Sequence, residues 1–174
     1  MGTSFAHGFW LIIEKLLRWC AHPRLRARLL AIFGARIGHN VRIYEVQLFN
    51  LEKGFTNLLI GDDVHIGPAC RLDLCGPLVV GPRSTLSPGV TILTHADPGR
   101  SHGSVICKIY PPHTASVTIG ADCWVGANAT LLAGAVLGDR VVIGAGSVVR
   151  DAIPSESLAT GAPATVKKNL DFAD

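Results

Sequence analysis

The residues best suited to chemistry near neutral pH are histidines gathered in one irregular segment. Three of the seven histidines, His95, His102 and His113, lie between residues 95 and 117. Imidazole accepts a proton near neutral pH and can therefore serve as a general base. His95 directly follows the apolar run 90–93, which would hold its backbone in place, whereas the other two lie inside the segment. From position alone, His95 can be either a catalyst or an ordinary surface residue.

A carboxylate that orients the base is the second requirement of such a site. Asp97 is the acid closest to His95 in the sequence. An aspartate two places away in a turn can also cap its own backbone. An orienting role and a capping role for Asp97 both stay open.

An aliphatic residue opens every block of six between Ile119 and Ile153, which read IGADCW, VGANAT, LLAGAV, LGDRVV, IGAGSV and VRDAIP. The same spacing occurs earlier at Ile60, Ile66 and Leu72. Such a block fits a short strand with one inward side chain, followed by a turn that favours small residues. Ordinary sheets show a period of two and hold no period of six over so many blocks. The pattern predicts a solenoid.

These repeats resemble the hexapeptide-repeat family over roughly residues 36–166. The resemblance implies a left-handed parallel β-helix of about five coils, with a short N-terminal helical segment and an extended loop at 95–117. We expect three parts: an amphipathic helical cap at 1–35, the β-helix with its loop at 36–154, and a C-terminal turn and tail at 155–174.

The segment VTILTHADPG resembles the extended-loop region of hexapeptide sugar O-acetyltransferases. The resemblance implies direct transfer of an acetyl group from acetyl-CoA to a sugar hydroxyl, with His95 as general base and His102 as the fallback. It also implies that Asp73, one coil earlier, contacts the acceptor, and we expect Asp97 and His102 to do so too. The run RLDLCG around Asp73 departs from the Asn-containing pattern of the family, which leaves the identity of the acceptor open.

The resemblance places the CoA donor along the C-terminal coils, where backbone of small residues meets pantetheine and basic groups meet phosphate. Thr165 occupies a position where relatives often carry Arg, and Lys167 could replace that contact. Trp124 could pack beside pantetheine or in a subunit interface, and the lysines could equally be solvated. The expected donor-site residues are Trp124, Ala127, Ala145, Arg150, Thr165, Lys167 and Lys168.

The N-terminal segment concentrates the positive charge. Residues 1–42 carry seven Lys or Arg against one acid, a net charge of +6, which leaves −3 for the remainder of a chain of net charge +3. Apolar residues including Phe5, Phe9, Trp10 and Trp19 predict an amphipathic helix, and Pro23 separates it from a second helix at 25–33. The apolar run is too short to span a bilayer and lacks the features of a signal peptide. It either packs on the solenoid end or a neighbouring subunit, or lies in a membrane interface through residues 5–33.

Several further expectations concern partners and rival functions. Five scattered cysteines without a CxxC pair indicate reduced thiols and a cytoplasmic location, with the inner face of the membrane as the alternative. The family resemblance implies a homotrimer, and no basic stripe supports nucleic-acid binding. The histidines lack the spacing of a zinc enzyme on this scaffold, so no metal is expected. An N-acyltransferase acting on an amino sugar, a serine O-acetyltransferase-like enzyme and a non-catalytic interaction module remain as alternatives.

Overall fold

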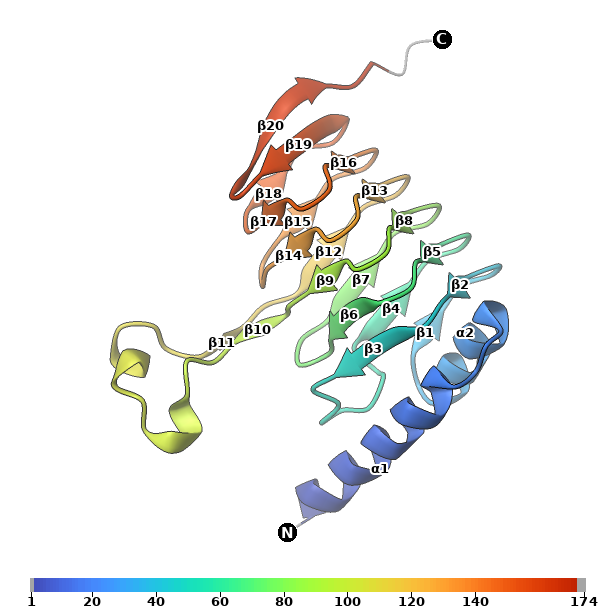
Figure 1. The fold of residues 1–174 in the computed structure, drawn as a ribbon, viewed down its shortest axis with the longest axis vertical. Helices are drawn as coiled ribbons and strands as arrows, with labels where there is room; N and C mark the ends of the chain where they lie inside the picture. Colours follow the sequence, from blue (N-terminus) through green and yellow to red (C-terminus); the bar gives the residue numbers. More distant parts are fainter. Residues whose placement is uncertain (1, 172–174) are drawn as a thin grey trace.

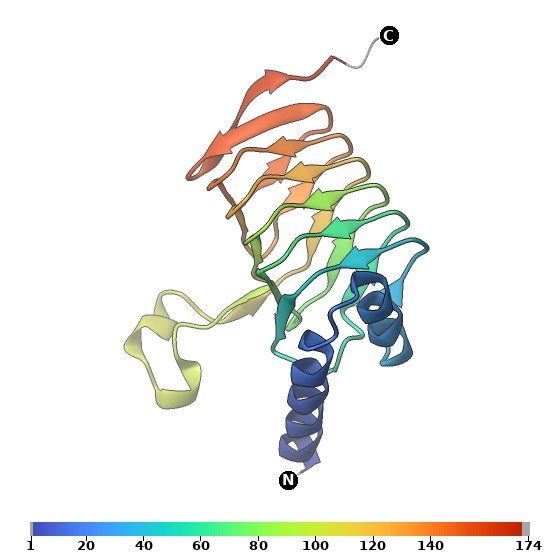
Figure 2. The ribbon, with the colours of Figure 1, turned by 45° about the vertical axis from the view of Figure 1, so that its right-hand side comes forward.

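The computed structural model describes the backbone of residues 2–171 and the side chains from residue 8 to residue 171. Phe5 and the last three residues of the expected tail therefore lie outside the described side chains. The chain winds into a parallel β-solenoid, with two helices at its N-terminal end and a separate arm that leaves one edge (Figures 1 and 2).

Three sheets form the sides of the solenoid, and strands of successive coils pair in parallel within each sheet. The first sheet contains β1 (Arg36–Ile37), β4 (Leu58–Ile60), β7 (Leu78–Val80), β12 (Val117–Ile119), β15 (Val136–Leu137) and β18 (Ala152–Ile153). The second contains β2 (Arg42–Ile43), β5 (His65–Ile66), β8 (Thr85–Leu86), β13 (Trp124–Val125), β16 (Val142–Ile143), β19 (Ser157–Gly161) and β20 (Ala164–Asn169). The third contains β3 (Val46–Phe49), β6 (Cys70–Asp73), β9 (Thr91–Ile92), β14 (Thr130–Leu131) and β17 (Val148–Val149).

The coil count exceeds the expectation. The third sheet has five strands, whereas the first has six, so a partial sixth turn follows five complete coils. The expected five coils were short by this last turn, because its blocks depart from the six-residue pattern after Ile153.

Inward aliphatic side chains stack at one register along each sheet and make the core. In the third sheet Leu48, Leu72, Ile92, Leu131 and Val149 occupy equivalent positions in successive strands, and all are buried. Every second residue of these short strands points outward, as the pleat requires. The core is therefore a set of parallel aliphatic columns.

The corner between the first and second sheets repeats one backbone conformation. In each coil a residue other than glycine takes a left-handed conformation there, and neighbouring coils are joined through its side chain: Asn40 with Asp63, Arg83 with Asp122, and Arg140 with Glu156. Side-chain bonds of this kind offset the cost of positive φ. They also align successive turns.

Two helices cap the first coil, α1 (Gly2–Arg18) and α2 (Pro23–Ile32). Imidazole Nδ1 of His22 accepts a hydrogen bond from the amide of Leu25 at the start of α2, so this helix begins at Pro23, two residues before the expected start. Arg26 is buried, and its guanidinium donates to the carbonyl oxygens of Leu17, Arg18, Cys20 and Ile43. This side chain thus ties the end of α1 to the first coil. Neither helix of the described chain is long and apolar enough to cross a bilayer.

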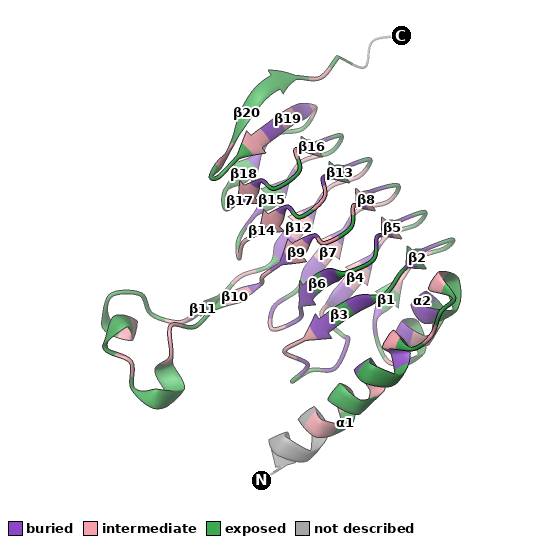
Figure 3. Cartoon of the chain, in the orientation of Figure 1, coloured by how far each residue is buried: buried purple, intermediate pink, exposed green. Residues whose placement is uncertain are grey.

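The C-terminal segment is more regular than the expected turn and tail. Strand β19 continues the second sheet, and β20 turns back to pair with β19 in antiparallel fashion. Backbone pairing with β19 therefore orders residues 164–169, which are mostly exposed (Figure 3).

The segment that interrupts the repeats forms a projecting arm. Its base is the antiparallel pair β10 (His95–Ala96) and β11 (His113–Thr114), and its tip holds the short helices η1 (Arg100–His102) and η2 (Val105–Lys108). The arm extends away from the solenoid (Figure 1). His95 is therefore the first residue of the arm and remains next to the rigid third sheet.

Candidate active site

His95 and Asp73 form a bonded pair where the arm leaves the solenoid. Nδ1 of His95 lies 2.5 Å from Oδ2 of Asp73. The His95 side chain is 30% exposed, while Asp73 is fully buried. An ionised aspartate can only accept a hydrogen bond, so this contact places the proton on Nδ1. In the neutral imidazole the other ring nitrogen, Nε2, is then the acceptor that can take a proton.

Asp73 is held as a carboxylate by several donors. Burial by itself raises the pKa of Asp73, but hydrogen bonds from His95, the Cys75 amide, the Asn50 side chain and the Thr94 amide together outweigh it and lower that pKa. The amide distances are 3.0 Å from Cys75 and 2.8 Å from Thr94. The His95 amide also donates to Oδ2 at 3.1 Å. The negative charge of Asp73 is thus held next to the imidazole of His95.

Asn50 completes this arrangement from the coil below. Its Nδ2 donates to Oδ1 of Asp73 at 2.8 Å, and it lies 3.4 Å from Nδ1 of His95. Asn50 has a φ of 58°, in the left-handed region that asparagine tolerates better than most residues. Sequence analysis missed Asn50, although its spacing of 23 residues from Asp73 matches one coil, as does the 22-residue spacing from Asp73 to His95.

The two aspartates, Asp73 and Asp97, differ in burial and in hydrogen-bond partners. Asp73 was expected at the acceptor, but its oxygens are enclosed and engaged by His95 and the surrounding donors. Asp97 is exposed, and its Oδ1 accepts from the amides of Gly99 and Arg100, both at 2.8 Å. These two bonds lower the pKa of Asp97. Asp97 therefore caps the turn at the start of the arm, and the carboxylate that orients His95 is Asp73.

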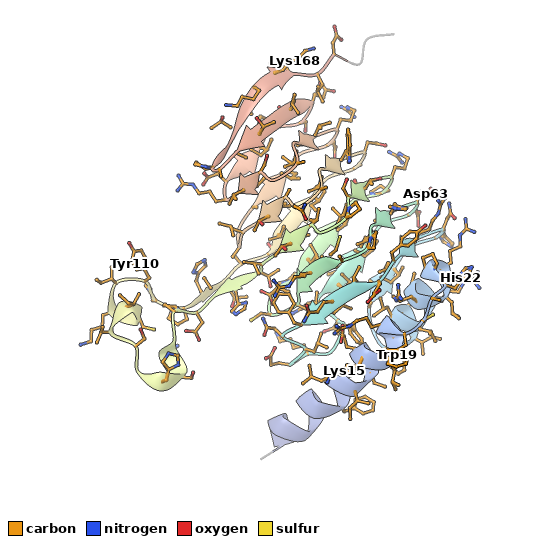
Figure 4. All side chains as sticks on the ribbon, viewed as in Figure 1. Lys15, Trp19, His22, Asp63, Tyr110 and Lys168 are labelled. Carbon is orange, nitrogen blue, oxygen red and sulfur yellow. The ribbon has the colours of Figure 1, made fainter. Side chains whose placement is uncertain are left out.

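The other histidines of the segment lie on the arm. His102 is exposed in η1, with its ring packed against the backbone of Gly99, where an added Cβ would come within 2.2 Å of the ring. His113 pairs with Ala96 in the base of the arm. A shallow hollow on the arm is lined by residues that include Asp97, Ile109, Tyr110 and His113, and Figure 4 labels Tyr110 at the tip. The described chain does not bring His102 to the buried pair.

Two of the expected donor residues lie side by side at the corner between the second and third sheets. The amide of Gly146 donates to the carbonyl of Ala127 at 2.9 Å, so Ala127 and Ala145 occupy successive coils of this corner. A Cβ on Gly126 would lie 2.6 Å from the Ala145 nitrogen, which shows how closely the coils approach there. Trp124 is exposed on the second sheet, and its Nε1 donates to Oγ of Ser87 at 2.9 Å.

The remaining residues expected at the donor site, Thr165 and the three basic ones, lie in two places. Thr165, Lys167 and Lys168 lie on β20, with Thr165 paired opposite Thr160 and Lys168 at the far end of the solenoid from α1 (Figure 4). Arg150 directly follows β17, at the C-terminal ends of the strands of the third sheet. Its Nε donates to Oδ2 of Asp151 at 3.0 Å. Arg150 is thus on the edge that carries His95, not on the edge of Ala127 and Ala145.

Of the five cysteines, Cys75 contributes to this site through its backbone amide. All five form no disulfide, and Cys70 and Cys123 are buried in the solenoid. Burial raises the pKa of the Cys70 thiol to about 11. Within residues 8–171 no three His, Cys, Asp or Glu side chains converge as metal ligands.

Several known proteins are similar to this chain. Residues 116–151 match the family model described as bacterial transferase hexapeptide (six repeats). The chain is 29% identical over 161 residues to the Escherichia coli K12 protein WcaF, named as a colanic acid biosynthesis acetyltransferase, covering 91% of this chain and 83% of that protein. It is 28% identical over 120 residues to the galactoside O-acetyltransferase of the same organism, covering 66% of this chain and 58% of that one.

The solenoid also matches solved structures. The hexapeptide-repeat acetyltransferase VCA0836 of Vibrio cholerae, solved with acetyl coenzyme A, superposes with a TM-score of 0.82 at 19% identity, covering 97% of this chain and 88% of that one. Repeats, register and superposition agree, and the chain has the same solenoid fold as this hexapeptide-repeat acetyltransferase structure.

Proposed function

We propose that this protein is an acetyl-CoA-dependent O-acetyltransferase that acetylates a hydroxyl of a sugar or polysaccharide precursor. The observation that carries the proposal is the His95–Asp73 pair, a partly exposed imidazole with a buried carboxylate on Nδ1. The names of the two Escherichia coli relatives support acetyl transfer and a sugar-related acceptor. The acetyl coenzyme A complex of the structural neighbour supports the donor.

The reaction follows from the placement of the proton. Nε2 of His95 takes the proton of the acceptor hydroxyl as its oxygen attacks the thioester carbonyl. The new C–O bond gives a tetrahedral oxyanion, and the C–S bond then breaks to release CoA thiolate, which recovers the proton from the imidazolium. Asp73 stabilises the imidazolium between these steps and holds the ring in one orientation. Asp73 is thus a positioning residue, because it touches the base and not the substrate.

The separation of His95 from Ala127 and Ala145 supports a shared site in a homotrimer. On one chain these residues lie at opposite ends of the strands of the third sheet. A closed three-fold assembly would bring the His95 edge of one subunit to the Ala127–Ala145 edge of the next. In this arrangement the arm, with Asp97 and His102, lies over the acceptor, while Trp124, Thr165, Lys167 and Lys168 lie along the donor. Arg150 shares the His95 edge and would reach the donor of the same interface.

A thiol-release assay tests the reaction. Purified protein is given acetyl-CoA with a panel of sugars, amino sugars and nucleotide- or lipid-linked sugars, and His95→Ala is compared with wild type. We expect release that depends on a hydroxyl acceptor and falls by at least about 100-fold in His95→Ala. Transfer only to amino groups would replace the O-acetyl assignment. Full turnover in His95→Ala would refute the base, and no stabilisation by CoA in a thermal melt would favour a non-catalytic module.

Subunit mixing tests the shared site. His95→Ala removes the base, and Ala145→Trp blocks the donor edge with an exposed bulky side chain. Each variant alone should be inactive. If the two edges come from different subunits, refolded mixtures regain activity because some interfaces carry both intact edges. A site within one chain predicts no recovery, and light scattering of each sample reports whether trimers form.

A further inference from the structure

Helix α1 uses one face to hold the solenoid. Trp10 packs edge-on against the buried Phe55 with ring centroids 5.5 Å apart. Glu14 is buried, accepts a hydrogen bond from the Leu48 amide at 3.2 Å and pairs with Arg18 at 2.7 Å. Leu17 is buried on the same face. The expected capping role is therefore performed by this side of the helix alone.

A second apolar face of α1 stays uncovered. Phe9, Ile12, Leu16 and Trp19 are 52%, 60%, 64% and 89% exposed. Their spacing of three, four and three residues places them on one stripe of a helix. Figure 3 shows the exposed side of α1 over the part of the helix whose side chains are described. Large apolar side chains gathered in such a stripe mark an interaction surface, whereas single ones do not.

Positive charge predominates around this stripe, and Glu45 of the first coil is an exposed acid near Arg18. Lys15, Arg24, Arg28, Arg36 and Arg42 are all exposed on the two helices and the first coil. Glu14, the only acid of residues 1–42, is buried and paired. Lys15 lies on the last turn of α1, and Trp19 directly follows the helix (Figure 4). The surface at this end thus combines an apolar stripe with an excess of positive charge.

We propose that α1 lies in the interface of an anionic lipid bilayer, with the stripe Phe9, Ile12, Leu16 and Trp19 among the acyl chains and the flanking cations at the headgroups. Apolar area and attraction to anionic lipid add together for helices of this kind, and Trp favours the interface. A second copy docked on the same face would bring five exposed cations against five, which opposes self-association there. The helix lies on the bilayer, because it is too short to cross it.

Vesicle flotation tests the proposal and requires no enzyme activity. Full-length protein is mixed with phosphatidylcholine vesicles, with or without phosphatidylglycerol as the anionic lipid, and the bound fraction is measured at low and at high salt. We expect binding to the anionic vesicles at least about tenfold stronger than to the neutral ones, and weaker at high salt. Ile12→Ser with Leu16→Ser should reduce binding by about tenfold or more, because both apolar anchors leave the acyl region.

A matched control replaces apolar residues of similar exposure on the arm. Val105→Ser with Ile109→Ser, at residues 70% and 71% exposed, should leave vesicle binding unchanged. If the α1 variant fails to fold, Lys15→Glu with Arg28→Glu keeps the apolar stripe and should weaken binding to anionic vesicles alone. The proposal would be overturned if wild type bound neutral and anionic vesicles equally, or if the arm control lost as much binding as the α1 variant. It would also be overturned if wild type bound no vesicles and the α1 variant instead dissociated an oligomer.

Discussion

Replacement of Asp73 by asparagine keeps the shape of the side chain and removes its charge. Both oxygens of the Asp73 carboxylate accept hydrogen bonds. Oδ2 accepts from the amides of Thr94 and His95, and Oδ1 accepts from the Cys75 amide and the Asn50 side chain. The NH₂ group of the substituted side chain must replace one of these oxygens and face its donors. At least two donors then lose their acceptor in a buried place, at about 1–3 kcal/mol each. We expect the free energy of unfolding at pH 7 to fall by about 2–6 kcal/mol.

The same change weakens the base. A charge-assisted hydrogen bond is worth about 1.5–3 kcal/mol, and about 1.36 kcal/mol corresponds to a factor of ten in rate. The loss of the His95–Asp73 contact should therefore lower kcat/KM by roughly 10- to 150-fold, measured by thiol release on the acceptor that wild type uses. Asp122→Asn is the matched control, because it removes an exposed ion pair with Arg83 at another corner and should change kcat/KM less than about twofold.

The pH dependence of stability gives an independent test. The folded-state pKa of Asp73 is below its ordinary value, so the carboxylate stabilises the fold above the unfolded-state pKa, near 4, and this contribution is lost as pH falls through the folded-state pKa. Urea unfolding of wild type and Asp73→Asn should therefore differ most near neutral pH and converge in acid. A folded Asp73→Asn protein with kcat/KM within about threefold of wild type would refute the orienting role of Asp73.

Three further predictions concern other parts of the chain. Asn50→Gly keeps the left-handed backbone but loses the bond to Asp73, so kcat/KM should fall about fivefold with little change in KM, and no change would place Asn50 outside the machinery. Arg26→Met leaves four carbonyl oxygens without their donor, and urea unfolding should show a loss of about 3 kcal/mol or more; a smaller loss would mean that water replaces the guanidinium. Cys70, with a pKa of about 11, should react with iodoacetamide at pH 8 on the order of 100-fold more slowly than an ordinary thiol, and mass spectrometry that finds fast labelling of Cys70 would contradict its burial.

The six-residue period was sufficient to predict the solenoid and its interruption. Each side of a coil buries one aliphatic residue, and these residues recur every six positions in the sequence. The turn after Ile153 was missed because β19 and β20 are longer strands joined as a hairpin, which carries no six-residue signal. The helices were expected from their apolar spacing, and the His22 cap and Pro23 moved the start of the second one.

The site was only partly predictable. Position alone left His95 open as a catalyst or a surface residue, and the family resemblance favoured it as the base. The carboxylate beside its ring was not expected to be Asp73, because that contact depends on the stacking of the coils. Asp97 is closer in sequence, yet its turn directs both of its hydrogen bonds to local amides. Asp73 is 22 residues away and arrives by the pairing of β6 with β9. In a solenoid, the partner of a candidate catalytic residue should therefore be sought one coil away before it is sought among adjacent residues in the sequence.

The arm leaves the third coil and the chain re-enters the fourth with no change in strand register, since Leu78 pairs with Val117 and Thr91 with Thr130 across the interruption. The solenoid therefore does not depend on the length or sequence of the segment between β10 and β11. Closing a longer loop costs only about 0.6 kcal/mol per doubling of its length. The arm can therefore be exchanged without altering the solenoid. If the proposed function holds, grafting this segment between His95 and Thr114 of related chains should change acceptor preference, while the core, His95 and Asp73 stay as they are.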